Sequence, residues 1–298
     1  MIWSSDADQP PSPEALRPAG RRGRKPAPIS DSAGLSHRAW LEPVRSQLFA
    51  SGLTLDDVVD RSGYSKARIS ELLRGNGYYP AWEITFSVIR ALGLPAVPML
   101  RLWAAAAQEA RKEPSWIRHS IEQVALQPEP PPVAHRAFVE AMERPYTDYA
   151  RAVLLTEKRA RFVVRETFDI LWLCWNEAAT SENLRRYAWR LLRSRVMARA
   201  HRRPDGRPDL RATVFSTAEV HDSVPGHMVA FSELTGLFDV LGLLPHDQLD
   251  VVVLRHLCGM PPDTVPDVVG LSPAITHAVD HHARATLERL LSPHSSRE

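Results

Sequence analysis

The sequence predicts an all-α protein with an N-terminal helix-turn-helix domain and two small helical domains joined by flexible linkers. Three observations support this fold class. Apolar residues recur at helical spacing in three blocks, no stretch of any length alternates apolar and polar residues as a strand does, and Pro-rich segments separate the blocks. A chain of 298 residues, 44% of them apolar, has material for about two domains of ordinary size.

Composition predicts where these blocks begin and end. Residues 1–35 are rich in Pro, Ser, Gly and charge, so we expect a disordered basic tail, and 292–298 form a short polar tail. Three helical blocks are expected, at 36–113, 137–203 and 231–291. Pro and Gly punctuate the two segments between them, so these are expected to be linkers, at 114–136 and 204–230.

The formal net charge of +2 hides an uneven distribution. Residues 17–26 carry five basic groups and no acid, and residues 185–203 carry eight arginines and no acid. By contrast, residues 239–280 hold six aspartates against Arg255 alone. Basic charge confined to particular segments is typical of proteins that contact nucleic acid.

Several classes of protein are disfavoured by the sequence. No apolar run approaches the ~20 residues that cross a bilayer, and the first residues are acidic and Pro-rich rather than basic then apolar. We therefore expect no membrane contact and a cytoplasmic, nucleoid-associated protein. The sequence has no Gly-rich phosphate loop, no G-x-S-x-G, no HExxH and no paired carboxylates in an apolar context, so we predict no enzyme activity and no cofactor. His277 and His281 share a helix face but have no further ligand at a suitable spacing, so we predict no metal site.

Residues 51–75 have the punctuation of a helix-turn-helix. Thr54 is a predicted N-cap for a helix over 55–61, Gly63 occupies the turn, where a positive φ is expected, and Ser65 caps the second helix. Five apolar residues have the spacing that packs two short helices together, namely Val58, Val59, Ile69, Leu72 and Leu73.

This block resembles the Xre/Cro repressor family of helix-turn-helix proteins over about residues 36–95. The matching positions are Gly52-Leu53-Thr54, Val59, Gly63, Ser65, Ile69-Ser70 and Leu72. The family often has Gln where this chain has Leu55, so one phosphate contact is expected to be missing. The resemblance implies binding of double-stranded DNA through the outer face of the second helix. The expected DNA-binding residues there are Ser65, Lys66, Arg68, Ser70, Glu71 and Arg74. A helical domain that binds no DNA is the alternative.

Residues 21–26, RRGRKP, resemble the Arg-Gly-Arg-Pro hook that lies in AT-rich minor grooves. Arg22 and Arg24 provide cationic charge on a segment without bulk, which suits a narrow and negative groove. Attraction to phosphates without insertion into the groove is the alternative interpretation.

The sequence ARFVVRETF at 160–168, followed by a basic helix at 187–203, resembles region 2 of a sigma factor of the extracytoplasmic-function (ECF) type. In that family the first helix docks on core RNA polymerase and the second reads promoter DNA. The resemblance implies a phosphate-binding surface formed by Arg186, Arg190, Arg193, Arg195, Arg199, Arg202 and Arg203. Trp175, Tyr187 and Trp189 offer faces for base stacking, although the spacing of Trp189 favours a place in the core. Arg161 and Phe162 replace an acidic pair of the family, which weakens the inference of polymerase binding.

Residues 243–291 resemble sigma region 4. The matching positions are Leu244-Pro245, Gln248, Val251-Val252-Val253, Leu254-Arg255, Gly259, Gly270-Leu271-Ser272, Ala283-Arg284-Ala285 and Leu287. The second helix-turn-helix falls at 267–287. Asp280 stands where an apolar core residue is usual, and histidines occupy positions where cations are expected, so we expect this helix to meet protein rather than DNA.

The leading hypothesis is a transcriptional regulator. Its N-terminal helix-turn-helix binds double-stranded DNA, and a divergent sigma-like half contacts core RNA polymerase or another protein. One alternative is a working ECF-like sigma factor. The other is an interaction protein that engages an anti-sigma-like partner without reading DNA. A homodimer is compatible with each of these interpretations.

Overall fold

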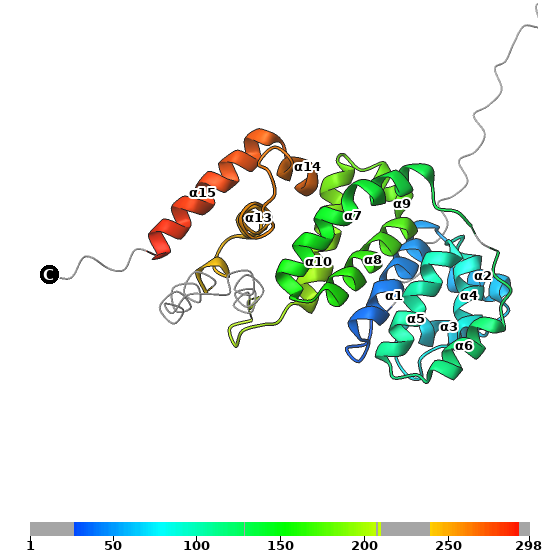
Figure 1. Ribbon diagram of the computed structural model, residues 1–298. Coiled ribbons are helices and arrows are strands. Elements are labelled where there is room, and N and C mark those ends of the chain that lie inside the picture. The colour runs from blue at the N-terminus through cyan, green and yellow to red at the C-terminus, as the bar shows by residue number, and fades with distance from the viewer. Residues whose placement is uncertain (1–26, 128, 207, 210–238, 292–298) are drawn as a thin grey trace, which may run out of the picture.

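The computed structural model describes residues 27–127, 129–206, 208–209 and 239–291 (Figure 1). Every regular element in these ranges is a helix, which confirms the predicted all-α fold class. None of the helices in the described ranges combines the length and apolar content that a bilayer crossing requires. Arg22 and Arg24 of the predicted basic tail lie outside the described residues.

Six helices form an N-terminal unit, defined here as residues 27–127. They are α1 (Leu35–Ala50), α2 (Leu55–Ser62), α3 (Lys66–Arg74), α4 (Trp82–Ala91), α5 (Ala96–Glu109) and α6 (Pro114–Glu122). Three fully buried tryptophans, Trp40, Trp82 and Trp103, lie in its core. Tyr79 links two of them, because its hydroxyl donates to the carbonyl of Trp103 at 2.6 Å and accepts from the indole of Trp40 at 3.2 Å.

The structure corrects the predicted linker at 114–136, because its first part is helix α6. Pro114 stands in the first turn of this helix, where a missing N–H is tolerated. Ile117 is buried in the core of the N-terminal unit, and the hydroxyl of Ser120 accepts from the backbone N–H of Trp82 at 2.7 Å. The Pro run that follows this short helix made the whole segment look like a linker, although the helix itself has apolar residues at helical spacing.

The end of the predicted tail also differs from expectation, because residues 27–34 are held against the N-terminal unit. The carbonyl of Ala27 accepts from the guanidinium of Arg45 at 2.7 Å. The backbone N–H of Ser30 donates to the carbonyl of Arg74 at 2.8 Å, at the end of α3. These contacts join the tail segment to the helix-turn-helix.

The remaining helices form a C-terminal unit, defined here as residues 133–209 and 239–291. They are α7 (Val133–Leu154), α8 (Glu157–Leu173), α9 (Trp175–Ala179), α10 (Leu184–Arg199), α13 (His246–Val252), the π-helix η1 (Val253–Leu257), α14 (Val265–Val269) and α15 (Pro273–Leu291). In Figure 1, α7, α8 and α10 lie together, α13 and α14 lie beside them, and α15 extends away.

The two predicted domains of the C-terminal half share one hydrophobic core in the structure. Tyr149 and Trp189 of the first block belong to the same buried cluster as Leu249, Leu254 and Val268 of the second. Two small domains joined by a flexible linker were predicted here, and among the described residues the two blocks pack into one core. The two units also meet each other, because Ile170 and Leu173 of α8 complete the core of the N-terminal unit.

Candidate nucleic-acid interface

The first helix-turn-helix is formed by α2 and α3, and local sequence explains both helix starts. The hydroxyl of Thr54 accepts from the backbone N–H of Asp57 at 3.2 Å, and the Asp57 carboxylate accepts from the N–H of Thr54 at 2.7 Å. This reciprocal capping box confirms the predicted N-cap. Gly63 has φ 74° in the turn, and Ser65 caps α3 by accepting from the N–H of Arg68 at 3.5 Å.

Helix α3 buries one face and presents the other to solvent. Ile69, Leu72 and Leu73 are buried against the N-terminal core together with Val58, as their spacing predicted. The predicted DNA-binding positions on α3 lie on the accessible side: Ser65, Lys66, Arg68, Glu71 and Arg74 are exposed, and Ser70 is half-buried. The first turn of α3 is therefore accessible from outside.

The charged side chains of α3 make only weak internal contacts. Lys66 lies 2.8 Å from a carboxylate oxygen of Asp56, but both side chains are well exposed, at 60% and 71%. Ion pairs between exposed groups contribute about 0–1 kcal/mol, so a phosphate can replace Asp56 as the partner of Lys66. The guanidinium of Arg68 lies 5.6 Å from the ring centroid of Tyr64 and remains exposed.

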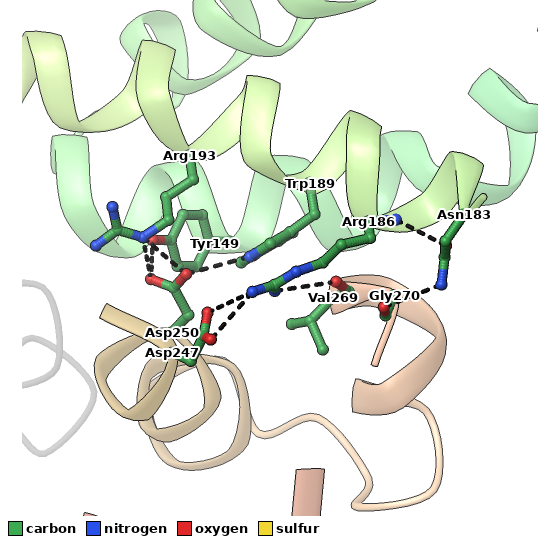
Figure 2. A network of polar contacts seen from close by, with 9 residues as sticks. All are labelled: Tyr149, Asn183, Arg186, Trp189, Arg193, Asp247, Asp250, Val269 and Gly270. Carbon is green, nitrogen blue, oxygen red and sulfur yellow. Dashed lines mark hydrogen bonds and ion pairs between the residues drawn. The ribbon is translucent and has the colours of Figure 1, made fainter. Parts of the chain in front are cut away.

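Helix α10 shows a different arrangement, because two of its predicted DNA-binding arginines, Arg186 and Arg193, face aspartates of the acid-rich segment (Figure 2). The guanidinium of Arg186 donates to the carboxylate of Asp247 at 2.8 and 3.0 Å. Arg193 donates through Nε to both oxygens of Asp250 at 3.0 and 2.8 Å. Arg190 is exposed and forms no ion pair within the described residues.

Asp250 is the most enclosed of these partners, with 1% of the residue exposed. Besides Arg193, its carboxylate accepts from the Tyr149 hydroxyl at 2.7 Å and from the Trp189 indole at 3.1 Å (Figure 2). Burial raises the pKa of Asp250, and the nearby Arg193 opposes that effect. Trp189 is fully buried in this network, so it cannot stack on a nucleic-acid base in this conformation.

The last turns of α10 are tied to α8 and to α1. The buried carboxylate of Glu166 accepts from Arg195 at 3.1 Å and from Arg199 at 2.7 Å. Arg195 also donates to the carbonyl of Leu35 at 2.8 Å, which joins the two units. Arg199 lies 5.6 Å from the ring centroid of Phe162, the residue that departs from the acidic pair of the sigma pattern.

The turn of the second helix-turn-helix packs directly on the first turn of α10. The side-chain amide of Asn183 donates to the carbonyl of Gly270 at 3.1 Å (Figure 2). Gly270 has φ 66°, and a Cβ placed there would collide with the backbone nitrogen of Arg186. Asp280, the acid at a usually apolar position, is 5% exposed and is paired with Arg255 and with Arg284.

Sequence reasoning did not identify the acidic partners of α10, although the acid-rich composition of 239–280 was the available signal. One basic and one acidic segment, far apart in the sequence, do not by themselves show that the two segments face each other. Comparison with protein-family models, with curated proteins and with solved structures finds no match to this chain.

Proposed function

We propose that this chain is a transcriptional regulator whose helix-turn-helix α2–α3 binds double-stranded DNA in a sequence-specific manner. The supporting observation is the exposed and capped first turn of α3. A helix whose N-terminal residues carry exposed polar and cationic side chains suits the major groove, where those side chains reach base edges. Ser65, Lys66 and Arg68 occupy that turn.

The residues of α3 divide into base-reading and phosphate-binding roles. Arg68 is suited to a guanine edge, because its planar guanidinium donates two parallel hydrogen bonds. Glu71 can accept from a cytosine amino group, and Ser70 can donate to or accept from several bases. Lys66 and Arg74 are suited to phosphates, which fix the register of the helix on the duplex without reading sequence.

The α10 arginines do not belong to this duplex-binding surface in the described conformation. Arg186 and Arg193 already hold carboxylates, and exchanging these for phosphates would leave Asp247 and the buried Asp250 without their cations. Arg190 remains accessible and can add one phosphate contact. Duplex recognition is therefore assigned to the N-terminal unit.

Binding-site selection from random duplexes tests this assignment. The full chain should enrich a defined sequence. Lys66→Ala with Arg68→Ala should weaken binding to it by about 1–3 kcal/mol through loss of the Arg68 base contact, with a further salt-dependent loss from the Lys66 phosphate contact. The matched control is Lys158→Ala with Arg118→Ala, which removes the same charges from exposed positions on α8 and α6. Absence of an enriched sequence, or equal losses in both double variants, would contradict the proposal.

For the C-terminal unit we propose a protein partner, either core RNA polymerase or another protein. The observation that favours protein over DNA is the outer face of α15, which presents Ile275 at 51% exposure with His277, His281 and His282, and on which the exposed Arg284 is paired with Asp280. Co-purification of the full chain with core RNA polymerase tests the first partner. Retention together with promoter-dependent transcription supports a working sigma factor, and absence of retention contradicts the polymerase assignment.

A further inference from the structure

A cavity of about 580 Å³ lies between the two units, within the size range of small-molecule sites. Val97 and Arg101 of α5 line it on the N-terminal side, and residues of α7 and α8 line it on the other. Its accessible apolar lining is aliphatic, because Val97, Pro131 and Val139 are each half-buried. An apolar ligand body placed against them would be removed from water, which favours binding.

The aromatic side chains of the wall are largely covered by other protein groups. Phe168 and Trp172 are each only 7% exposed. The ring of Phe168 stacks on that of Tyr146, with centroids 5.7 Å apart and an interplanar angle of 9°. The guanidinium of Arg101 lies 5.8 Å from the ring centroid of Trp172. Little ring surface is therefore left for an aromatic ligand, whereas an aliphatic chain needs no flat face to pack on.

Thr147 and His135 also line the cavity, but they use their polar atoms within the protein. The hydroxyl of Thr147 donates to the carbonyl of Glu143 at 2.7 Å. Nε2 of His135 donates to the carbonyl of Phe168 at 3.1 Å, and Nδ1 is enclosed by protein atoms. Burial lowers the pKa of His135, so its ring adds no charge at neutral pH. The arginines and carboxylates therefore decide which polar head suits the cavity.

Two of the four arginines that line the cavity are engaged within the protein. Arg101 donates through Nε to both oxygens of the buried Asp169, at 2.9 and 3.0 Å. Arg161 donates to the carboxylate of Glu157 at 2.6 Å. Each of these guanidiniums already has a carboxylate partner, so neither is the main partner of a ligand.

The other two arginines, Arg136 on α7 and Arg165 on α8, are accessible. Both are exposed, and neither forms an ion pair within the described residues. The lining holds four arginines against the three carboxylates of Glu129, Glu143 and Asp169, which leaves one positive charge in excess. A monoanion balances that excess, and a guanidinium binds a carboxylate through two parallel hydrogen bonds.

We propose that this cavity binds an aliphatic carboxylate of medium chain length. The chain packs against Val97, Pro131 and Val139, and the carboxylate is bound by Arg136 and Arg165. The ligand contacts both units, because α5 forms one wall and α7 and α8 form the other. The site does not depend on DNA binding by α3, and its test uses no DNA.

Calorimetric titration of the full chain with decanoate tests the site. Two other compounds separate the recognised features: decyltrimethylammonium has the same chain with the opposite charge, and hexanoate has the same head on a shorter chain. We expect decanoate to bind with one-to-one stoichiometry and decyltrimethylammonium to bind at least about tenfold more weakly. Hexanoate should also bind at least about tenfold more weakly, because each buried methylene contributes about fourfold to affinity. Equal affinity for decanoate and either compound, or no heat at millimolar decanoate, overturns the proposal.

Charge variants test where the carboxylate is bound. Arg136→Gln with Arg165→Gln should weaken decanoate binding at least about tenfold, because the head loses both guanidiniums. The matched control is Arg118→Gln with Arg144→Gln, which removes two exposed arginines, on α6 and α7, that do not line the cavity. Equal decanoate affinity in the two double variants overturns the assignment of the head group.

Filling variants test where the chain is bound. Val97→Trp and Val139→Trp each enlarge a side chain of the lining, one from α5 and the other from α7, so each should abolish decanoate binding. Circular dichroism checks that helical content is kept. The two substitutions lie in different units, so a folding defect in one leaves the other as the test. Undiminished binding in either folded variant overturns the assignment of the cavity.

Discussion

At the scale of single residues, the buried carboxylate of Asp250 holds three helices of the C-terminal unit together. Its carboxylate joins α13 to α7 and α10 through Arg193, Tyr149 and Trp189. A buried ion pair of this kind adds little stability compared with an apolar pair of the same shape, but removal of one partner leaves the other buried and uncompensated. The network therefore determines how α13 is oriented on α10 more than it adds net stability.

The first residue-scale prediction concerns this network. Asp250→Ala should lower the free energy of unfolding by about 3–5 kcal/mol, because Arg193 and two aromatic donors lose their acceptor together. Urea denaturation followed by circular dichroism measures the change. Asp263→Ala is the control: Asp263 is exposed, so its loss should change stability by no more than about 0.5 kcal/mol. Similar small effects of both substitutions would contradict the role assigned to Asp250.

The second residue-scale prediction concerns pH. Burial, together with Arg38, lowers the pKa of His37 to about 4, and its ring stacks on Trp40 at 5.1 Å. A histidine whose folded pKa lies below its unfolded value of about 6.5 binds fewer protons when folded, so stability is lost as the pH falls from about 6.5 to 4. We expect a loss of roughly 2–3 kcal/mol over that range, measured by urea denaturation at each pH. His37→Phe should show a shallower loss, and an identical slope would contradict this assignment.

At the scale of elements, the two helix-turn-helix motifs use the same turn in different surroundings. Gly63 and Gly270 both adopt a positive φ that disfavours other residues. Gly63 has open space where a Cβ would be, and Gly270 contacts the backbone of α10. The first motif is therefore presented to solvent, and the second is packed against the arginine-rich helix.

This difference leads to an element-scale prediction. Gly63→Ala should lower the free energy of unfolding by about 1 kcal/mol, which is the cost of holding a residue other than glycine at a positive φ. Gly270→Ala should lower it by at least about 2 kcal/mol, because α14 must also move away from Arg186. Thermal and urea denaturation of the two variants give the comparison. Equal losses would show that the turn at Gly270 is not held against α10.

At the scale of the whole molecule, opposite charges in distant segments neutralise each other. The arginine-rich segment 185–203 and the acid-rich segment 239–280 form four ion-paired contacts, through Arg185, Arg186, Arg193 and Arg203. These contacts overlie a common apolar core. The acid-rich segment therefore covers a cationic surface on α10. Separation of α13–α15 from α10 would expose that surface, although the net charge of the chain is small.

The whole-molecule prediction follows from that masking. A chain that ends at residue 209 should bind duplex DNA more tightly at low salt, without sequence preference. The slope of the logarithm of the binding constant against the logarithm of the salt concentration should steepen by about 0.9 for each arginine that gains a phosphate contact. The same truncation uncovers Tyr149 and Trp189, so it should bind a hydrophobic dye. Fluorescence anisotropy over a salt series measures the first effect, and unchanged affinity and slope would contradict the masking.

Local chemistry allowed the helix-turn-helix at 51–75 to be predicted in detail. Thr54, Gly63 and Ser65 act through neighbours within a few residues, and the apolar spacing of Ile69, Leu72 and Leu73 specifies the buried face. The short helix α6 was missed because a few apolar residues before a Pro run are a weak signal. The pocket lined by Arg101, His135 and Phe168 was not predictable, because its walls combine α5 with α7 and α8, and α6 with the Pro-rich segment separates α5 from the other two along the chain.

The sequence by itself determined the all-α class, the caps and turns of the first helix-turn-helix, and the existence of separate basic and acidic segments. These properties depend on residue type and short-range spacing, which a linear pattern contains. Only the tertiary structure decided which charges remain accessible. Arg193 and Asp250 are 57 positions apart, and their pairing depends on how α13 packs on α10. Packing of α10 against α13 and α8 encloses four of its arginines, Arg186, Arg193, Arg195 and Arg199, whereas the first turn of α3 stays exposed.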